Sequence, residues 1–332
     1  MRKEERITLY PMKFRPRFIE KPWGGFRFRD ELGYEGVPDN PCGEAWLLSA
    51  VPGLETVVDN GPLQGNTLSE VYEVFMEELT GEALYEKHPE QFPLLVKLLD
   101  ANEWLSLQVH PNDQLADKRY NSTGKTEMWY ILDAEQGATL MSGFNREMDR
   151  NTMVFVTENG ALPDVMHAEP VAKGDLFYTP AGRVHAIGPG IMLAEIQQTS
   201  DVTYRLWDWG RVDQDGKPRE THLHKALDAI DFQLNDHPKR AYQQTVNAAN
   251  EMIRCDHFFV NIIPFNTPMK NDYSHLDTCV ALLCTKGAGA LISEPWFIPF
   301  RAGEVILVPQ NTSSVELIAE QPAEVLEIYV PV

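Results

Sequence analysis

The feature that most limits the fold is a repeated β-type segment. Val171-Ala-Lys-Gly-Asp-Leu-Phe-Tyr-Thr-Pro180 aligns with Phe300-Arg-Ala-Gly-Glu-Val-Ile-Leu-Val-Pro309, and both place a glycine and an acid before an apolar run that ends at proline. Downstream, Leu193-Ala-Glu-Ile196 matches Val325-Leu-Glu-Ile328. Self-similarity of this kind indicates two copies of one structural unit.

The two copies differ immediately after the shared proline. The first continues Pro180-Ala-Gly-Arg-Val-His185, whereas the second continues Pro309-Gln-Asn-Thr-Ser-Ser314. Histidine is the commonest metal ligand in proteins. Only the first copy therefore keeps a metal-capable side chain, and we expect the second copy to be a structural partner without metal.

Short apolar or alternating runs closed by Gly, Pro, Asn or Asp are typical of an all-β sandwich or barrel. The 332 residues include 23 prolines and 22 glycines, enough to end many short strands. Helical periodicity is clear between residues 68 and 79, preceded by a capping box of Thr67 and Glu70. We expect the helical region to continue through residues 91–99, and a weaker helix at residues 222–230.

The charge and the ends of the chain exclude several classes of partner. Asp and Glu number 49 against 29 Lys and Arg, a net charge of −20 that repels nucleic acids and anionic membranes. Apolar stretches such as Cys279–Cys284 are far shorter than the roughly 20 residues of a membrane span. The charged N-terminus resembles no secretory signal, and the four cysteines form no paired spacing. We therefore expect a cytoplasmic protein with reduced thiols.

Two segments place polar side chains on one face of a strand. In Trp104–His110 the polar residues alternate with apolar ones, a pattern that on an ordinary sheet simply faces water. Gly124–Leu132 repeats this alternation. The residues that share a face are Ser106, Gln108 and His110 in the first segment and Lys125, Glu127 and Trp129 in the second. Together they predict a site rather than two solvated faces.

A third element joins them. Its spacing, Gly174-x5-Pro180-x-Gly182-x2-His185, resembles the second signature of the cupin β-barrel superfamily, with Pro189 where an asparagine often stands. The resemblance implies a metal-binding β-barrel.

Further blocks resemble the zinc-dependent mannose-6-phosphate isomerases, in their shorter bacterial form. The blocks are Lys-Pro-Trp-Gly-Gly at 21–25, Gly-Glu-Ala-Trp-Leu-Leu-Ser at 43–49, Gln-Val-His-Pro at 108–111, Gly-Lys-Thr-Glu at 124–127, Gly-Arg-Val-His-Ala-Ile at 182–187, Glu-Ile-Gln-Gln-Thr-Ser-Asp at 195–201 and Thr-Tyr-Arg-Leu-Trp-Asp-Trp at 203–209. The likeness runs from about residue 14 to the end and is densest between residues 95 and 210.

The resemblance implies one zinc ion per chain, held by Gln108, His110, Glu127 and His185. Imidazole and carboxylate are good zinc ligands, and this set of nitrogen and oxygen donors leaves a position for substrate oxygen or water. Sites of this composition also accept Fe, Mn, Co or Ni, so the identity of the metal rests on the resemblance.

The reaction implied is the interconversion of mannose 6-phosphate and fructose 6-phosphate through an enediol. Lys125 is a candidate for charge stabilisation or proton transfer, the alternative being an ordinary surface lysine. Arg205 is a candidate for binding phosphate or the enediolate, the alternative being a surface ion pair with Asp201 or Asp208. Glu195 is a candidate acid or base.

Four further residues are candidates for substrate contact: Ser106 for the phosphate, and Lys21, Trp23 and Arg183 for the pocket. Two other functions remain open, namely another metal-cupin enzyme such as a dioxygenase and a sugar-phosphate binding protein without turnover. Lys125 and Arg205 favour an anionic substrate, which argues against the first.

The resemblance also implies a mainly β chain of two cupin-type, jelly-roll barrels. We expect a catalytic domain over residues 1–210 with a helical insertion at about 66–100, a connecting segment over 211–245, and a degenerate C-terminal domain without metal over 246–332. We expect a monomer or homodimer that binds a small sugar phosphate, with no nucleic-acid or membrane partner.

Overall fold

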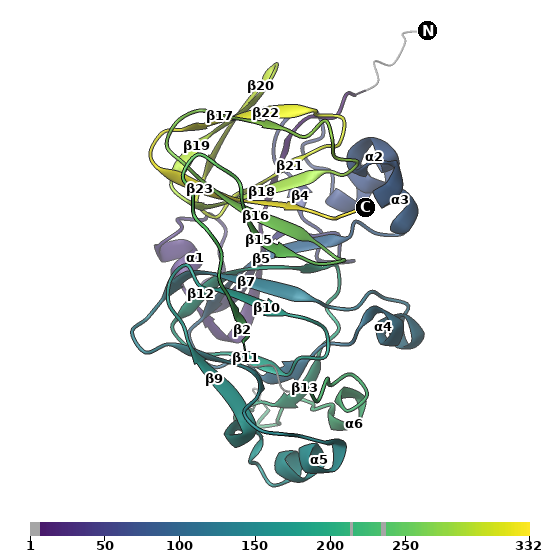
Figure 1. Cartoon of the computed structure of the whole chain (residues 1–332), viewed down its shortest axis with the longest axis vertical. Helices are drawn as coiled ribbons and strands as arrows, with labels where there is room; N and C mark the ends of the chain where they lie inside the picture. Colours follow the sequence, from purple (N-terminus) through teal and green to yellow (C-terminus); the bar gives the residue numbers. More distant parts are fainter. Residues whose placement is uncertain (1–6, 213–214, 234–236) are drawn as a thin grey trace. The chain divides into compact units, whose positions relative to one another are not determined.

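The structure is a computed structural model that describes residues 7–212, 215–233 and 237–332. It is mainly β, as expected (Figure 1). The chain packs as two compact units: unit 1 combines the residues up to Arg17 with Trp46–Leu95 and Tyr242–Val332, and unit 2 combines Phe18–Ala45 with Val96–Ala241. The units therefore interleave along the chain, whereas the sequence suggested contiguous domains.

Unit 2 holds the first copy of the repeat in two sheets. The larger sheet has the order β14-β10-β7-β12-β5-β2-β3, and the smaller has the order β13-β6-β11-β8-β9. The strands of the larger sheet are β2 (Arg17–Gly25), β3 (Cys42–Leu48), β5 (Leu94–Ala101), β7 (Glu127–Ala134), β10 (Leu176–Thr179), β12 (Ile191–Gln198) and β14 (Lys239–Arg240). Those of the smaller sheet are β6 (Leu107–Val109), β8 (Thr139–Phe144), β9 (Met166–Pro170), β11 (His185–Ile187) and β13 (Tyr204–Trp207).

Side chains of the two sheets of unit 2 meet between them, in a region that we call the lumen. One end of it is filled by an apolar cluster to which Trp129, Phe177 and Leu193 of the larger sheet and Leu140 and Ile187 of the smaller sheet contribute. Because side chains alternate along a strand, this cluster also fixes which neighbouring polar residues face the lumen.

A second apolar cluster lies on the other face of the smaller sheet. There Leu107 and Val184 pack with Met153 of α5 (Arg150–Glu158) and Ala226 of α6 (Leu223–Ala226). The 3-10 helix η1 (Leu162–Val165) joins this cluster, and α4 (Asp113–Tyr120) follows β6. This covering holds the smaller sheet in place against the lumen.

Unit 1 repeats the arrangement. Its sheets have the orders β15-β16-β23-β18-β21-β1-β4 and β17-β22-β19-β20, with an apolar core between them. The strands are β1 (Met12–Arg15), β4 (Val57–Val58), β15 (Asn250–Arg254), β16 (Phe259–Phe265), β17 (Met269–Asp272), β18 (Val280–Lys286), β19 (Ala288–Ser293), β20 (Trp296–Arg301), β21 (Val305–Val308), β22 (Ser314–Ala319) and β23 (Ala323–Tyr329).

The strand orders confirm the repeat. β10-β7-β12-β5 of unit 2 corresponds to β21-β18-β23-β16 of unit 1, and β6-β11-β8-β9 corresponds to β17-β22-β19-β20. The pairing registers then assign counterparts to the expected metal ligands. Gln108, Glu127 and His185 correspond to Asp272, Val280 and Ser314. That the C-terminal copy binds no metal remains a prediction.

The helical insertion is shorter than expected. Helix α2 (Leu68–Thr80) carries the expected capping box, and α3 (Glu82–Lys87) follows it, whereas α1 (Arg27–Asp30) is a single turn. Residues 94–99, expected to be helical, form the buried strand β5 instead. A short apolar run fits either a buried strand or a buried helix, so periodicity alone could not separate them. The helix expected at 222–230 is reduced to α6.

The capping box offers a test of local stability. The Thr67 hydroxyl accepts a hydrogen bond from the Glu70 backbone N–H at 3.1 Å, and the Glu70 carboxylate accepts one from the Thr67 backbone N–H at 2.7 Å. We expect Thr67→Ala to lower the free energy of unfolding by about 1 kcal/mol, and Thr67→Ser to lower it much less. Chemical denaturation of both variants checks this, and equal losses would contradict the hydroxyl's role.

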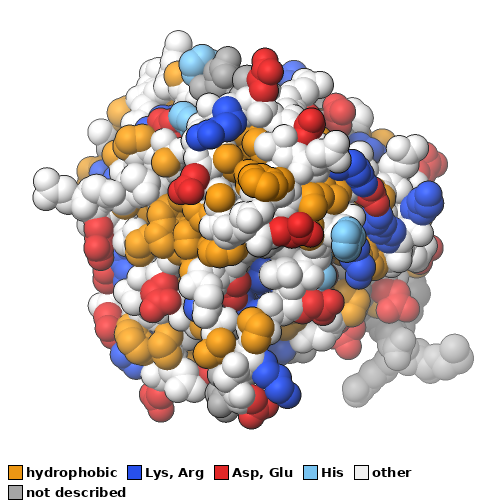
Figure 2. All heavy atoms as spheres, turned by 90° about the horizontal axis from the view of Figure 1, so that it is seen from below, with side chains coloured by type: hydrophobic (Ala, Val, Ile, Leu, Met, Phe, Trp, Pro, Cys, Tyr) orange, Lys and Arg blue, Asp and Glu red, His pale blue; other side chains and the backbone are white. Residues whose placement is uncertain are grey.

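The state of the cysteines and the charges on the surface are as the composition predicts. None of the four cysteines, which all lie in described residues, forms a disulfide, and burial raises the pKa of Cys42 to about 11 and those of Cys279 and Cys284 to about 12. In the described residues, no helix has the length and apolar character needed to cross a membrane. Figure 2 shows the lowest face of Figure 1, where acidic and basic side chains are interspersed around hydrophobic ones, so that their fields partly cancel.

Candidate metal centre

Four side chains form a row across the smaller sheet of unit 2. Arg205 on β13 pairs with Gln108 on β6, which pairs with His185 on β11, which pairs with Ser142 on β8. Residues directly opposite one another on neighbouring strands share a face. Since His185 points toward Glu127, the whole row faces the lumen.

A second row crosses the larger sheet and meets the first. Thr179 on β10 pairs with Glu127 on β7, which pairs with Gln197 on β12. Two residues after Glu127 on β7, Trp129 pairs with Glu195 on β12. The Trp129 and His185 ring centroids are 5.2 Å apart. The polar faces expected on separate strands therefore converge.

His185 and Glu127 of these rows, together with His110 just after β6, have the geometry of a metal site. The ligating atoms of His110, Glu127 and His185 all lie within 4.8 Å of one another. The Glu127 oxygens are 3.3 Å from His110 Nε2 and 3.7 Å from His185 Nε2. Ligands bound tetrahedrally at zinc's usual distance of about 2.0–2.1 Å lie about 3.4 Å apart, so the spacing fits such an ion.

The fourth expected ligand lies at the same point. Gln108 Nε2 is 3.3 Å from His185 Nε2, and the Ser106 hydroxyl is 3.4 Å from Gln108 Oε1. A half-turn of the amide places its oxygen, the atom that binds metals, toward the histidines. The structure thus brings all four expected ligands together.

Unpartnered polar atoms mark the same place. Glu127 Oε2, Ser142 Oγ, Thr179 Oγ1 and Gln197 Oε1 are buried without a hydrogen-bond partner among the described residues. All belong to the two rows. Buried polar groups are normally paired, so a cluster of unpaired ones indicates a place for an ion, water or substrate. The donor set and these atoms together fit a zinc ion.

Both histidines are held in the form that binds metal. Nδ1 of His110 lies 2.9 Å from the carbonyl of Val202, and Nδ1 of His185 lies 2.9 Å from that of Arg183. A carbonyl only accepts, so each Nδ1 carries the proton and each Nε2 keeps a lone pair. Burial lowers the pKa of both imidazoles, which keeps them neutral.

Lys125 is buried beside the metal ligands. Its Nζ lies 2.5 Å from Glu127 Oε1 and 3.4 Å from His110 Nε2. Burial raises the pKa of Glu127, but the charge of Lys125 and the neighbouring histidines lower it more strongly, to about 2. Burial lowers the pKa of Lys125, but Glu127 and Glu195 outweigh that effect and raise it. The alternative of a surface lysine is therefore wrong.

This chain is similar to known proteins over nearly its whole length. The family model for the catalytic domain of type I phosphomannose isomerase matches residues 12–141. Mannose-6-phosphate isomerase ManA of Bacillus subtilis strain 168 is 35% identical over 314 residues, which cover 94% of this chain and 96% of the relative. The chain belongs to the mannose-6-phosphate isomerase family.

Other members of the family agree. The mannose-6-phosphate isomerase of Streptococcus mutans is 39% identical over 220 residues, 66% of this chain and 67% of the relative. The crystal structure of the Bacillus subtilis mannose 6-phosphate isomerase matches 97% of this chain and 100% of its own with a TM-score of 0.88 at 29% identity. A mannose 6-phosphate isomerase solved with zinc and yttrium shares the fold, with a TM-score of 0.77 at 15% identity over 98% of this chain and 100% of its own.

A second buried ion pair in this isomerase chain was missed from the sequence. Lys97 Nζ on β5 lies 3.5 Å from Glu195 Oε2, and Trp129 donates a 3.0 Å hydrogen bond to Glu195 Oε1. Burial lowers the pKa of Lys97 and raises that of Glu195. The signal in the sequence was a lysine inside Leu94-Leu-Val-Lys-Leu-Leu99, since lysine is almost never fully buried without a partner.

Removing one member of the Lys97–Glu195 pair should cause a large loss of stability, and removing the other member as well should recover most of it. Lys97→Met leaves Glu195 buried without its cation, and breaking a buried ion pair in this way costs about 3–5 kcal/mol. We expect Lys97→Met to lower the melting temperature sharply, and Lys97→Met/Glu195→Gln to recover most of the loss because both charges are removed. Thermal unfolding of the two variants measures the coupling. A double variant no more stable than the single one would contradict it.

Arg205 lies among other arginines at the edge of its row. Its Nη1 donates to the carbonyl of Glu220 at 2.8 Å, and its buried Nε has no hydrogen-bond partner among the residues that the structure describes. Asp208, the partner suggested for Arg205, instead binds Arg211 at 2.8 Å and Arg219 at 2.5 Å. Burial, then the charge of Arg219, lowers the pKa of Arg205. Arg211 also has two buried nitrogens without a partner.

The remaining candidates have different surroundings. Lys21 forms a 3.0 Å ion pair with Glu44, whose charge also acts on Lys97 and Lys125. Trp23 belongs to the apolar cluster that fills one end of the lumen. Arg183 is buried with one hydrogen bond, to the carbonyl of Tyr178, and burial and Arg240 lower its pKa to about 10. Substrate contact by these residues remains a prediction.

Proposed function

We propose that this chain interconverts mannose 6-phosphate and fructose 6-phosphate in the lumen of unit 2. The observation that supports this most is the convergence of His110, Glu127 and His185, with Lys125 against the carboxylate. A metal with an adjacent cation can stabilise the negative charge of an enediolate. The family argues against a dioxygenase, and Lys125 argues against an uncharged substrate.

Zinc is the proposed metal, one ion per chain, held by Gln108, His110, Glu127 and His185. Two imidazoles, a carboxylate and an amide oxygen suit zinc, and a relative of the same fold was solved with it. When bound, the ion supplies a Lewis acid that polarises the sugar's carbonyl and the neighbouring hydroxyl.

The chain's own residues must move protons between adjacent carbons. In the aldose-to-ketose direction, a base removes the proton from C2 and an acid delivers one to C1, while the C2 hydroxyl proton passes to the C1 oxygen. We propose that Glu195 moves the proton between C2 and C1, since its carboxylate is buried on the lumenal face and is oriented by Trp129 and Lys97. Lys125 is proposed to stabilise the enediolate or to donate to its oxygen.

The phosphate needs cationic partners at the edge of the lumen. We propose Arg205 for this role or for binding the enediolate, and its unpartnered Nε and the free nitrogens of Arg211 support it. Ser106 is proposed as a further phosphate contact, with Lys21, Trp23 and Arg183 lining the pocket.

The deciding experiment is a coupled assay for fructose 6-phosphate formed from mannose 6-phosphate. We expect turnover in the purified protein, its loss after a chelator and dialysis, and its return with stoichiometric zinc. Zinc content measured in parallel should follow activity. Turnover that survives complete zinc removal would overturn the metal's role, and absence of turnover at full zinc occupancy would favour a binding protein.

The setting of the enzyme is also a proposal. Free cysteines with raised pKa suit the reducing cytoplasm, and a net charge of −20 disfavours nucleic-acid and membrane partners. We propose a cytoplasmic monomer or homodimer whose partner is a small sugar phosphate.

A further inference from the structure

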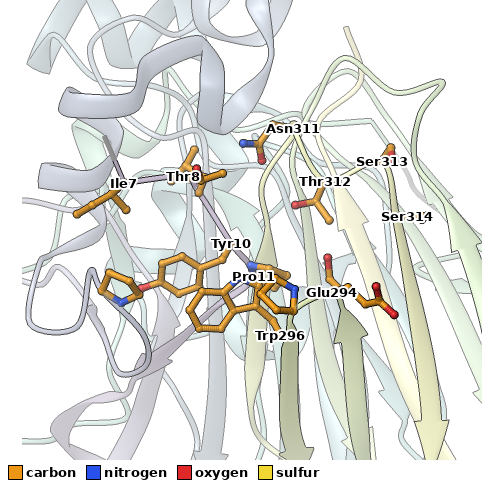
Figure 3. A pocket seen from close by; sticks show the side chains of 14 residues that line it. Ile7, Thr8, Tyr10, Pro11, Glu294, Trp296, Asn311, Thr312, Ser313 and Ser314 are labelled. Atoms are coloured by element: carbon orange, nitrogen blue, oxygen red, sulfur yellow. The ribbon is translucent and has the colours of Figure 1, made fainter. Parts of the chain in front are cut away.

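Unit 1 contains a pocket of about 780 Å³ that is separate from the catalytic lumen (Figure 3). Its lining comes from the segment before β1, from Pro62, from the β19–β20 turn and from the β21–β22 loop, all within unit 1. That loop corresponds in the repeat to the one that ends in His185. The volume falls in the roughly 300–1,000 Å³ range of small-molecule sites.

One wall of the pocket is aromatic and apolar. Tyr10 and Trp296 stack with ring centroids 4.4 Å apart and an interplanar angle of 22°. The Tyr10 hydroxyl donates to the carbonyl of Asn60 at 2.7 Å and accepts from the backbone N–H of Leu63 at 2.8 Å, which fixes the ring. Trp296 is only partly buried and lines the pocket, with Pro62 nearby. This wall is therefore a rigid platform.

The polar part of the lining lies partly beside Trp296, at Glu294, and partly across from Tyr10, at Asn311, Thr312 and Ser313, as Figure 3 shows. Within the described part of the chain, its side chains form no hydrogen bond or ion pair with other residues. They are Glu294, Asn311, Thr312, Ser313 and Ser314. Hydroxyl, amide and carboxylate groups at one surface offer both donors and acceptors to a ligand.

The charge of the lining excludes the enzyme's own substrate. Among the described residues that line the pocket, Glu294 is the only charged one, and it is negative. A sugar phosphate would meet repulsion here, in contrast to the lysines and arginines around the catalytic lumen. The lining therefore disfavours an anionic ligand, and its hydroxyl and amide groups suit a neutral ligand that is rich in hydroxyl groups.

We propose that this pocket binds an uncharged carbohydrate. The C–H groups on one face of a sugar ring pack against the electron-rich face of an aromatic side chain such as Trp296. The hydroxyl groups around the ring then bond to Glu294 and the serine and threonine hydroxyls opposite. This inference goes beyond the isomerase reaction, because the ligand and the site are both different.

Saturation-transfer NMR with mannose, maltose and cellobiose tests the proposal on the full chain, with mannose 6-phosphate present to fill the catalytic site. We expect at least one neutral sugar to bind with a dissociation constant on the order of 1 mM. Trp296→Ala should weaken it at least tenfold, whereas Phe297→Ala, an exposed neighbour that does not line the pocket, should leave it unchanged.

A second variant guards against misfolding of Trp296→Ala. Ser313 is exposed, so Ser313→Trp should fill the pocket without disturbing the core, and we expect it to abolish binding. Isomerase activity should be unchanged in all three variants. The proposal fails if no neutral sugar binds up to 50 mM, if binding persists in Ser313→Trp, or if mannose 6-phosphate displaces the sugar.

Discussion

The His110→Ala/His185→Ala double variant is expected to be purified with almost no zinc and to lose isomerase turnover by at least about a thousandfold, or about 4 kcal/mol of transition-state stabilisation. Both imidazoles present Nε2 to Glu127 from a buried position. Without them the centre keeps only one carboxylate and one amide, too few donors for a stable site. Elemental analysis and the coupled assay measure the two losses.

A surface histidine provides the control. His167 on β9 pairs with Glu169 outside the metal centre, so His167→Ala should keep both zinc and turnover. Near-ultraviolet circular dichroism establishes whether the double variant is folded. Full zinc occupancy in a folded double variant would show that the ligands have been assigned to the wrong residues.

The second large effect is expected from Arg205→Ala, which should keep its zinc but lose about 100-fold or more in kcat/KM, or about 3 kcal/mol. Arg205 shares a row with Gln108 and His185, yet it is not among the grouped ligands. Arg146→Ala, a change at an exposed arginine, should leave kcat/KM unaltered. The same result for Arg205→Ala would remove Arg205 from the site.

The kinetics also distinguish the two roles proposed for Arg205. If its guanidinium holds the phosphate group, the loss should fall mainly on KM and should vanish when unphosphorylated mannose is the substrate. If it stabilises the enediolate, kcat should fall for both sugars. The purified variant and wild type, assayed side by side with each sugar, give the answer.

Strand alternation predicted which polar residues share a face, whereas the proposed set of metal ligands came from the resemblance to the isomerase family. The period of two correctly placed Gln108 and Glu127 on inward faces, and the spacing to His185 supplied the third strand. The capping box at Thr67 was equally local and was confirmed. Such features depend on residues that are close in sequence, so a single sequence can reveal them.

Features set by distant segments were harder to predict. Strand β5 was taken for helix because its residues are buried on both faces, which erases the alternation that marks a strand. The role of Lys97 could not be predicted either, because its partner Glu195 is almost a hundred residues away along the sequence. The grouping of residues 46–95 with the C-terminal segment likewise depends on tertiary packing.

Three lysine–glutamate pairs of unit 2 affect the order in which metal and substrate bind. Lys21 with Glu44, Lys97 with Glu195 and Lys125 with Glu127 give three positive and three negative charges, a sum of zero. The carboxylates thus cancel the lysine charges beside the metal site, so that the arginines at the edge of the lumen and the bound ion must attract a dianion to this chain of charge −20. A bound divalent ion would add two positive charges beside these pairs. We therefore expect metal-free protein to bind the sugar phosphate more weakly than zinc-loaded protein does, so that metal binding precedes substrate binding.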